Sequence, residues 1–156
     1  MTEPPLPPDE LASRLMEVFT RVGTLHRRVY RKIEQDAAPQ GLSVGIRAIL
    51  DLLREHGPMT VPDMGRAQSL SRQFVQRMVN DAAAADLVKF QPNPLHQRSS
   101  LIALTPAGTS AITAAIMREH ALLRRTGGGL TDADISSCLE VLDHMLNLFD
   151  DVDMNG

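Results

Sequence analysis

The sequence contains few aromatic residues and a single cysteine, and both scarcities narrow the possible folds. Among its 156 residues there is no Trp, and aromatic residues make up only 3%. A core with so few rings must be built from Leu, Ile, Val, Met and Ala, which favours helices over a β-sandwich. The one cysteine, Cys138, excludes an internal disulfide framework and a cysteine-rich metal site.

Long apolar runs are also missing. No stretch approaches the roughly 18 consecutive apolar residues of a membrane-spanning helix. The opening MTEPPLPPDE is rich in proline and acid and lacks the basic and apolar regions of a signal peptide. We therefore expect a cytoplasmic protein without a membrane segment. Residues 1–8 are expected to form a disordered tail, 9–150 a single domain, and 151–156 an acidic tail.

The net charge of −3 gives no sign of a nucleic-acid partner, but the charges are unevenly distributed. Residues 66–98 contain five basic and two acidic side chains, whereas residues 131–156 contain seven acids and neither Lys nor Arg. Such asymmetry permits a local anionic partner on a globally acidic protein. Ordinary scatter of surface charge would produce the same pattern, so charge alone does not decide.

Apolar residues at three- and four-residue steps predict two helices in the first third of the chain. The first spans 9–37, with Asp9 as its N-cap. Pro39 and Gly41 are expected to end it. The second runs over 43–56, where Ile and Leu residues share one face.

A helix-turn-helix unit and a β-hairpin are predicted next. Two short helices are joined by a tight turn at 68–70, and Ser71 is a suitable N-cap for the second helix. LVKFQ and SSLIAL are strand-like runs, and the Pro-Asn-Pro between them suits the tip of a hairpin. Thr105 and Thr131 then cap two further helices within 106–150.

Three consecutive stretches accompany this order of elements: LSVGIRAILDLL, TVPDMGRAQSLSRQFVQRMVNDAAAADLV and NPLHQRSSLIALTPAG. Over about residues 42–108 they resemble the signatures of the multiple antibiotic resistance regulator (MarR) family, most specifically in the pattern R-S-x-L-x-x-L-T-x-x-G. The resemblance implies a mainly α, homodimeric winged helix-turn-helix transcription factor with a two-stranded wing, which a small ligand or oxidation releases from DNA. It places the winged segment at 42–105 and dimerisation helices at 9–37 and 106–150.

The chain departs from the family pattern in and near the wing. The family usually has Asp where this chain has His96, Arg where it has Gln97, Gly where it has Asp86, and often Leu where it has Ala82. The wing has therefore lost a positive charge and an acid that commonly braces its tip. These departures keep a second interpretation open, in which a dimeric winged-helix module with weakened DNA binding acts through protein partners.

Four polar residues on one face of the second short helix are candidate DNA contacts. Arg can bridge two guanine acceptors, and Gln can pair with adenine in the same two-pronged way. Because residues of the first turn approach bases most closely, Arg72, Gln73 and Gln76 are predicted to read bases. Arg77, further along, is predicted to hold a phosphate. The alternative is a solvated helix face.

Three further residues complete the predicted interface with a pseudo-palindromic operator in double-stranded DNA. Ser69 and Ser71 could offer a hydroxyl or backbone N–H to phosphate. Arg98, retained at the family's wing position, is predicted to enter the adjacent minor groove, whose negative potential attracts Arg in A·T-rich DNA. The alternative for Arg98 is a surface side chain that pairs with a nearby acid.

A small effector molecule is the remaining expected partner. His26 and Tyr30 are one turn apart and project on one side of the first helix, and Arg47 could supply a positive charge. Together they are candidates to bind a small aromatic or carboxylate ligand in the cleft that the resemblance implies. Alternatively, His26 and Tyr30 are interface residues and Arg47 is solvated.

The sequence indicates neither an enzyme nor a bound cofactor. The five histidines contain no pair at i and i+4, so we expect no metal site. The GGG at 127–129 follows no strand and lacks a phosphate-loop Lys, so it is interpreted as a break between helices. Cys138 is interpreted as a structural residue buried at the dimer interface. We therefore predict a DNA-binding regulator, more specifically a repressor.

Overall fold

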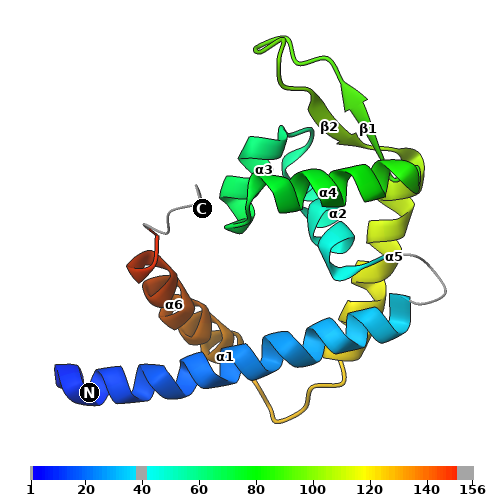
Figure 1. Ribbon diagram of the computed structural model, residues 1–156. Helices are drawn as coiled ribbons and strands as arrows, with labels where there is room; N and C mark the ends of the chain where they lie inside the picture. The colour runs from blue at the N-terminus through cyan, green and yellow to red at the C-terminus, as the bar shows by residue number, and fades with distance from the viewer. Residues whose placement is uncertain (1, 38–41, 151–156) are drawn as a thin grey trace. The chain divides into compact units, whose positions relative to one another are not determined.

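The computed structural model describes residues 2–37 and 42–150, and within them the chain is mainly helical with one small antiparallel sheet (Figure 1). The elements follow in the order α1 (Pro8–Ala37), α2 (Val44–His56), α3 (Val61–Gln68), α4 (Arg72–Ala84), β1 (Val88–Gln91), β2 (Leu101–Leu104), α5 (Pro106–Leu123) and α6 (Asp132–Leu148). This confirms the predicted winged helix-turn-helix class. The chain forms two compact units that divide between Val44 and Gly45.

The first unit consists mostly of the 30-residue helix α1. The prediction that Asp9 is its N-cap is wrong, because the helix begins one residue earlier, at Pro8, and Asp9 lies in the first turn. Proline is favourable at the first helical position since its φ is already helical, and an acid in the first turn still interacts favourably with the helix dipole. Pro39 and Gly41, the predicted end, lie outside the described residues.

The core of the second unit is aliphatic, as the scarcity of aromatic residues predicts. Within the unit, α3 packs on α4, α4 on β1, and α5 on β2. The largest fully buried side chains lie on α2, α3, α4, β2 and α5, and they are Ile49, Leu50, Met64, Ile102, Ile112, Val75 and Val79. On α4, Val75 and Val79 are buried, whereas Phe74 and Met78 are half-buried.

The two strands of the wing pair in one antiparallel register, in which Val88 lies opposite Leu104 and Gln91 opposite Leu101. A short bridge extends this sheet, because Met59 and Ile102 exchange two backbone hydrogen bonds of 3.1 and 2.7 Å. The bridge was not predicted, and it attaches the wing to the segment before α3. The second strand begins at Leu101 rather than Ser99, since the Ser99 N–H bonds to the His96 carbonyl within the loop.

Thr105 joins the end of α4 to the start of α5. Its hydroxyl accepts the Gly108 N–H at 3.0 Å, as the predicted N-cap requires, and donates to the Asp86 carbonyl at 2.6 Å. Asp86 itself has a φ of +59°, in the left-handed region where only glycine is free of a steric penalty. This conformation explains why the family pattern has Gly there.

The last helix begins with a complete capping box. The Thr131 hydroxyl accepts the Asp134 N–H, and the Asp134 carboxylate accepts from both the hydroxyl and the backbone N–H of Thr131. The cap at Thr131 is thus confirmed, and GGG does separate α5 from α6. None of the described helices combines the length and the apolarity needed to span a membrane.

Candidate nucleic-acid interface

The turn between α3 and α4 is fixed by local backbone requirements. Gly65 lies so close to the Leu70 carbonyl that an added Cβ would come within 2.9 Å of that oxygen. Ser69 ends α3 with a φ of +52°, and the Ser71 hydroxyl then accepts the Phe74 N–H at 3.2 Å to start α4. This tight connection sets where the first turn of α4 begins.

The buried positions of α4 decide which of its side chains face outward. Val75, Val79 and Ala82 are fully buried, and they recur at steps of three and four residues. The opposite face must therefore be solvent-exposed, and it carries the four predicted DNA contacts Arg72, Gln73, Gln76 and Arg77. These two observations explain how one helix both closes the core and presents a polar surface.

A groove of about 660 Å³ lies between this polar face of α4 and the wing, and we call it the α4–wing groove. Five of the seven predicted DNA-binding residues line it, Arg98 from the wing and the rest from α4. The full lining is Val61, Pro62, Arg72, Gln73, Gln76, Arg77, Asn80, Phe90, Arg98, Ser99, Ser100 and Ile102. Ser69 and Ser71, the other two, occupy the turn before α4 and are not among the lining residues.

The three arginines of the α4–wing groove differ from three other arginines of the same unit. Arg47, Arg54 and Arg66 each pair with a carboxylate, from Glu119, Asp51 and Asp63 respectively. In the described part of the chain, Arg72, Arg77 and Arg98 form no ion pair. The Arg77 guanidinium lies 5.4 Å from the Phe74 ring centre, a cation–π arrangement that orients it without neutralising its charge.

Four polar or aromatic groove residues were not predicted: Asn80, Phe90, Ser99 and Ser100. Asn80 could have been found, because it continues the polar face of α4 and its side-chain oxygen accepts from Gln76 at 3.0 Å. Phe90 could not, since it lies two residues after the buried Val88, where strand alternation predicts the same face, and yet it is 51% exposed. Its exposure depends on how β1 lies against α4, which no local pattern encodes.

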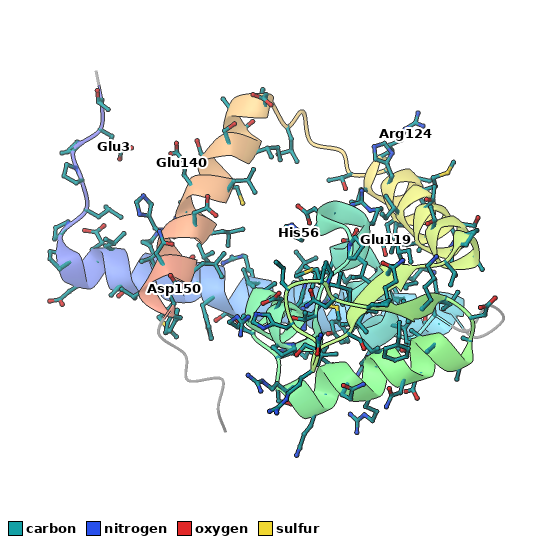
Figure 2. The ribbon with its side chains drawn as sticks, turned by 90° about the horizontal axis from the view of Figure 1, so that it is seen from above. Glu3, His56, Glu119, Arg124, Glu140 and Asp150 are labelled. Carbon is teal, nitrogen blue, oxygen red and sulfur yellow. The ribbon has the colours of Figure 1, made fainter. Side chains whose placement is uncertain are left out.

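The candidate ligand residues belong to different units of the chain. On α1, the His26 and Tyr30 rings are in tilted contact, with centroids 4.3 Å apart. In the other unit, the Arg47 guanidinium donates to both carboxylate oxygens of Glu119, which projects from α5 (Figure 2), and lies 3.5 Å from Asp51. The hydrogen bond with Glu119 raises the pKa of Arg47, outweighing the opposing effect of burial.

Two smaller expectations concern metal and thiol chemistry. Over residues 2–37 and 42–150, the structure has no cluster of three or more His, Cys, Asp or Glu side chains that could hold a metal ion. Cys138 is exposed in the single chain, so the burial expected for it depends on a partner subunit.

Residues 41–99 match the sequence profile of the MarR family. An uncharacterized protein of Mycobacterium tuberculosis is 28% identical over 138 residues, which are 88% of this chain and 93% of that protein. The HTH-type transcriptional repressor NicR of Pseudomonas putida is 24% identical over 135 residues, covering 84% of this chain and 85% of NicR.

Solved structures give the same result for the fold. A crystal structure of a MarR family transcription regulator is 27% identical with a TM-score of 0.77, covering 95% of this chain and 98% of that one. BpsR of Bordetella bronchiseptica, whose DNA binding is regulated by 6-hydroxynicotinic acid, is 26% identical with a TM-score of 0.61. That match covers 80% of this chain and 98% of BpsR.

Proposed function

We propose that this chain, a MarR family winged-helix transcription regulator, binds a pseudo-palindromic operator in double-stranded DNA as a homodimer and represses transcription. One observation carries the proposal: α4 and the wing bring Arg72, Arg77 and Arg98 to the same groove, and none of them has an acidic partner among the described residues. Guanidinium groups without internal partners are available to phosphate and base acceptors. A globally acidic chain thus presents a locally cationic surface.

Each groove residue has a role that follows from its position. With α4 in the major groove, Arg72, Gln73 and Gln76 face base edges, where bidentate pairs discriminate by about 1–3 kcal/mol. Arg77, one turn after Gln73, lies nearer the backbone and holds a phosphate. Arg98 reaches the adjacent minor groove from the wing.

Ser69 and Ser71 complete the phosphate contacts at the start of α4. The Ser71 hydroxyl oxygen already accepts the Phe74 N–H, but its proton remains free to be donated to phosphate oxygen. The beginning of a helix also favours an anion through its unpaired N–H groups and its dipole. These contacts position the protein without reading sequence.

Apolar surfaces that a single chain leaves exposed support the proposed homodimer. Helices α1 and α6 both carry stripes of large apolar residues, with Phe19 57% and Leu139 55% exposed. A two-fold dimer that joins these helices would cover both stripes and Cys138, and would set recognition helices about 34 Å apart. Light scattering at micromolar concentration should give twice the 17.1 kDa of one chain, and a 17.1 kDa species would contradict this.

A small aromatic carboxylate is the proposed effector. BpsR, a relative by structure, responds to 6-hydroxynicotinic acid, which belongs to this class. Arg47 is the candidate carboxylate partner, and because Glu119 and Asp51 already engage it, an incoming carboxylate must compete with them. His26 and Tyr30, in contact on α1, are the candidate aromatic partners.

Thermal-shift measurements with 6-hydroxynicotinic acid and phenolic acids test the effector proposal. Wild type should be stabilised by about 2.7 kcal/mol at a ligand concentration of 100 times Kd, and Arg47→Ala should respond much less at equal ligand concentration. Equal stabilisation of both proteins, or none in a preparation that binds DNA, would remove Arg47 from the ligand site.

The DNA proposal is tested by mobility shift with duplex DNA from upstream of the protein's own gene. Wild type should retard this duplex at concentrations that leave a scrambled duplex unbound. Arg72→Ala and Gln73→Ala should reduce that discrimination, whereas Arg77→Ala should weaken binding to both duplexes. No retardation at low salt by an intact dimer would contradict the proposal and favour the interpretation in which the protein acts through protein partners.

A further inference from the structure

Leu95, at the tip of the wing, is the most exposed large apolar residue of those described, with 83% of its surface accessible. Other strongly exposed apolar residues, such as Phe19 and Leu139, belong to helical stripes that a second copy can cover. Leu95 belongs to no stripe. Its neighbours along the loop are proline and polar residues, and the loop extends away from α4 and α5 (Figure 1).

The backbone around Leu95 is braced. The Asn93 side-chain oxygen accepts the Leu95 N–H at 3.1 Å, and the His96 carbonyl accepts the Ser99 N–H at 3.3 Å. Pro92 and Pro94 each fix one φ angle in the same turn. The backbone that carries Leu95 is therefore ordered at the tip before any partner binds, which lowers the entropic cost of inserting the side chain.

The charges around Leu95 favour a polyanion. No acidic residue occurs in the sequence between Leu87 and Arg118, so the whole wing lacks negative side chains. Its ionisable groups are Lys89, His96 and Arg98, and Arg98 lies in the α4–wing groove only three residues from Leu95. Leu95 is therefore close along the chain to a residue that is a candidate DNA contact.

We propose that Leu95 enters the minor groove ahead of Arg98 and inserts between two base pairs as an apolar wedge, which bends the duplex. Apolar side chains that enter the minor groove unstack a base step and kink the DNA toward the major groove. Pyrimidine–purine steps deform most easily. The preferred sequence beneath the wing is therefore A·T-rich DNA that contains a TA step, which also provides the negative potential that attracts Arg98.

The inference rests on the proposed DNA binding, and it makes a prediction that DNA binding alone does not. A wing that contacts only phosphates and groove edges needs no deformable base step. Such a wing should bind a stiff A-tract at least as well as it binds a site that contains a TA step. A wedge needs the flexible step because unstacking a base step costs free energy, and a flexible step costs less. Replacing the TA step by an A-tract should therefore weaken wild type at least about fivefold, the low end for one altered base step.

The test measures the bend and the affinity together, by energy transfer between the ends of a labelled upstream duplex. Wild type should bring the ends closer, and Leu95→Ala should lose most of that change together with the preference for the TA step. Leu95→Met, which keeps a long apolar side chain, should retain both. Gln97→Ala is the matched control in the same loop, and it should bend DNA like wild type.

Two outcomes overturn the inference, and they are distinguishable. If wild type and Leu95→Ala bind with the same bend and the same step preference, the wedge is wrong while DNA binding stands. If wild type fails to bind the upstream duplex at all, the proposed function and the wedge both fail. In that case, loss of a protein partner in Leu95→Ala would identify the tip as a protein contact.

Discussion

The carbonyl oxygen of Leu87 lies where a side chain at Gly108 would have to go: a Cβ built on Gly108 would be 1.9 Å from that oxygen. The same oxygen accepts the Thr105 N–H at 3.1 Å. The first turn of α5 therefore packs directly against the backbone that leads from α4 into β1. This contact explains the glycine in the R-S-x-L-x-x-L-T-x-x-G pattern, and it holds the wing at the end of α4.

Gly108→Ala should lower the free energy of unfolding by about 1–3 kcal/mol or more, since about 1–3 kcal/mol is the usual cost of overpacking a tight site. The obstacle is backbone, so a side-chain rotation cannot relieve the clash. Urea unfolding followed by circular dichroism measures the change. Gly127→Ala is the matched control, because nothing lies within 4 Å of a Cβ built there. Equal stability of the two variants would show that the α5 contact is loose.

Asp86→Gly should raise stability by a few tenths to about 1 kcal/mol, because it removes the penalty of a left-handed Asp. This gain exceeds the stability that is lost because glycine gives the unfolded chain more conformational entropy. The backbone carbonyl that accepts the Thr105 hydroxyl is retained. Asp86→Ala should instead be destabilising, because alanine keeps the Cβ and lacks a short polar group. The midpoint of urea unfolding ranks the stabilities of wild type, Asp86→Gly and Asp86→Ala. If Asp86→Ala were more stable than Asp86→Gly, the backbone at position 86 would not be strained.

The Arg47–Glu119 pair should contribute to holding α2 against α5. A double-mutant cycle with Arg47→Ala and Glu119→Ala should give a coupling energy of about 1 kcal/mol or more, within the range for neighbouring charged partners. The half-buried, two-pronged geometry is the reason. The exposed pair Arg14–Glu17 on α1 is the control and should couple by less than about 0.5 kcal/mol. Equal couplings would make Arg47–Glu119 an ordinary surface pair.

The capping box of α6 should weaken in acid. The hydrogen bonds from the Thr131 hydroxyl and backbone hold the pKa of Asp134 below its ordinary value of 3.8. A carboxyl whose pKa is lowered on folding stabilises the fold at higher pH, and that contribution is lost as pH falls through the lowered value. The stability difference between wild type and Asp134→Asn should therefore be constant above about pH 5 and shrink below 3.8. A constant difference down to pH 2 would contradict this.

The parts of the fold that local chemistry determines were predictable from the sequence. The caps at Ser71, Thr105 and Thr131 and the polar face of α4 all depend on residues within one or two turns. Contacts between distant segments were not predictable. Arg47 was a candidate to bind a ligand, with a solvated side chain as the alternative, and neither interpretation could foresee its partner Glu119, which lies 72 residues away. Phe90 was not predicted for the same reason.

The central claim is that the α4–wing groove binds DNA, and fluorescence anisotropy with a labelled upstream duplex tests it most directly. We expect Arg72→Ala and Arg98→Ala each to weaken binding by about 1–3 kcal/mol. Arg124→Ala removes the same charge at the far end of α5 (Figure 2), about 27 Å from the start of that helix, and should bind nearly like wild type. If all three variants lose the same affinity, binding follows overall charge and the groove is not the DNA site.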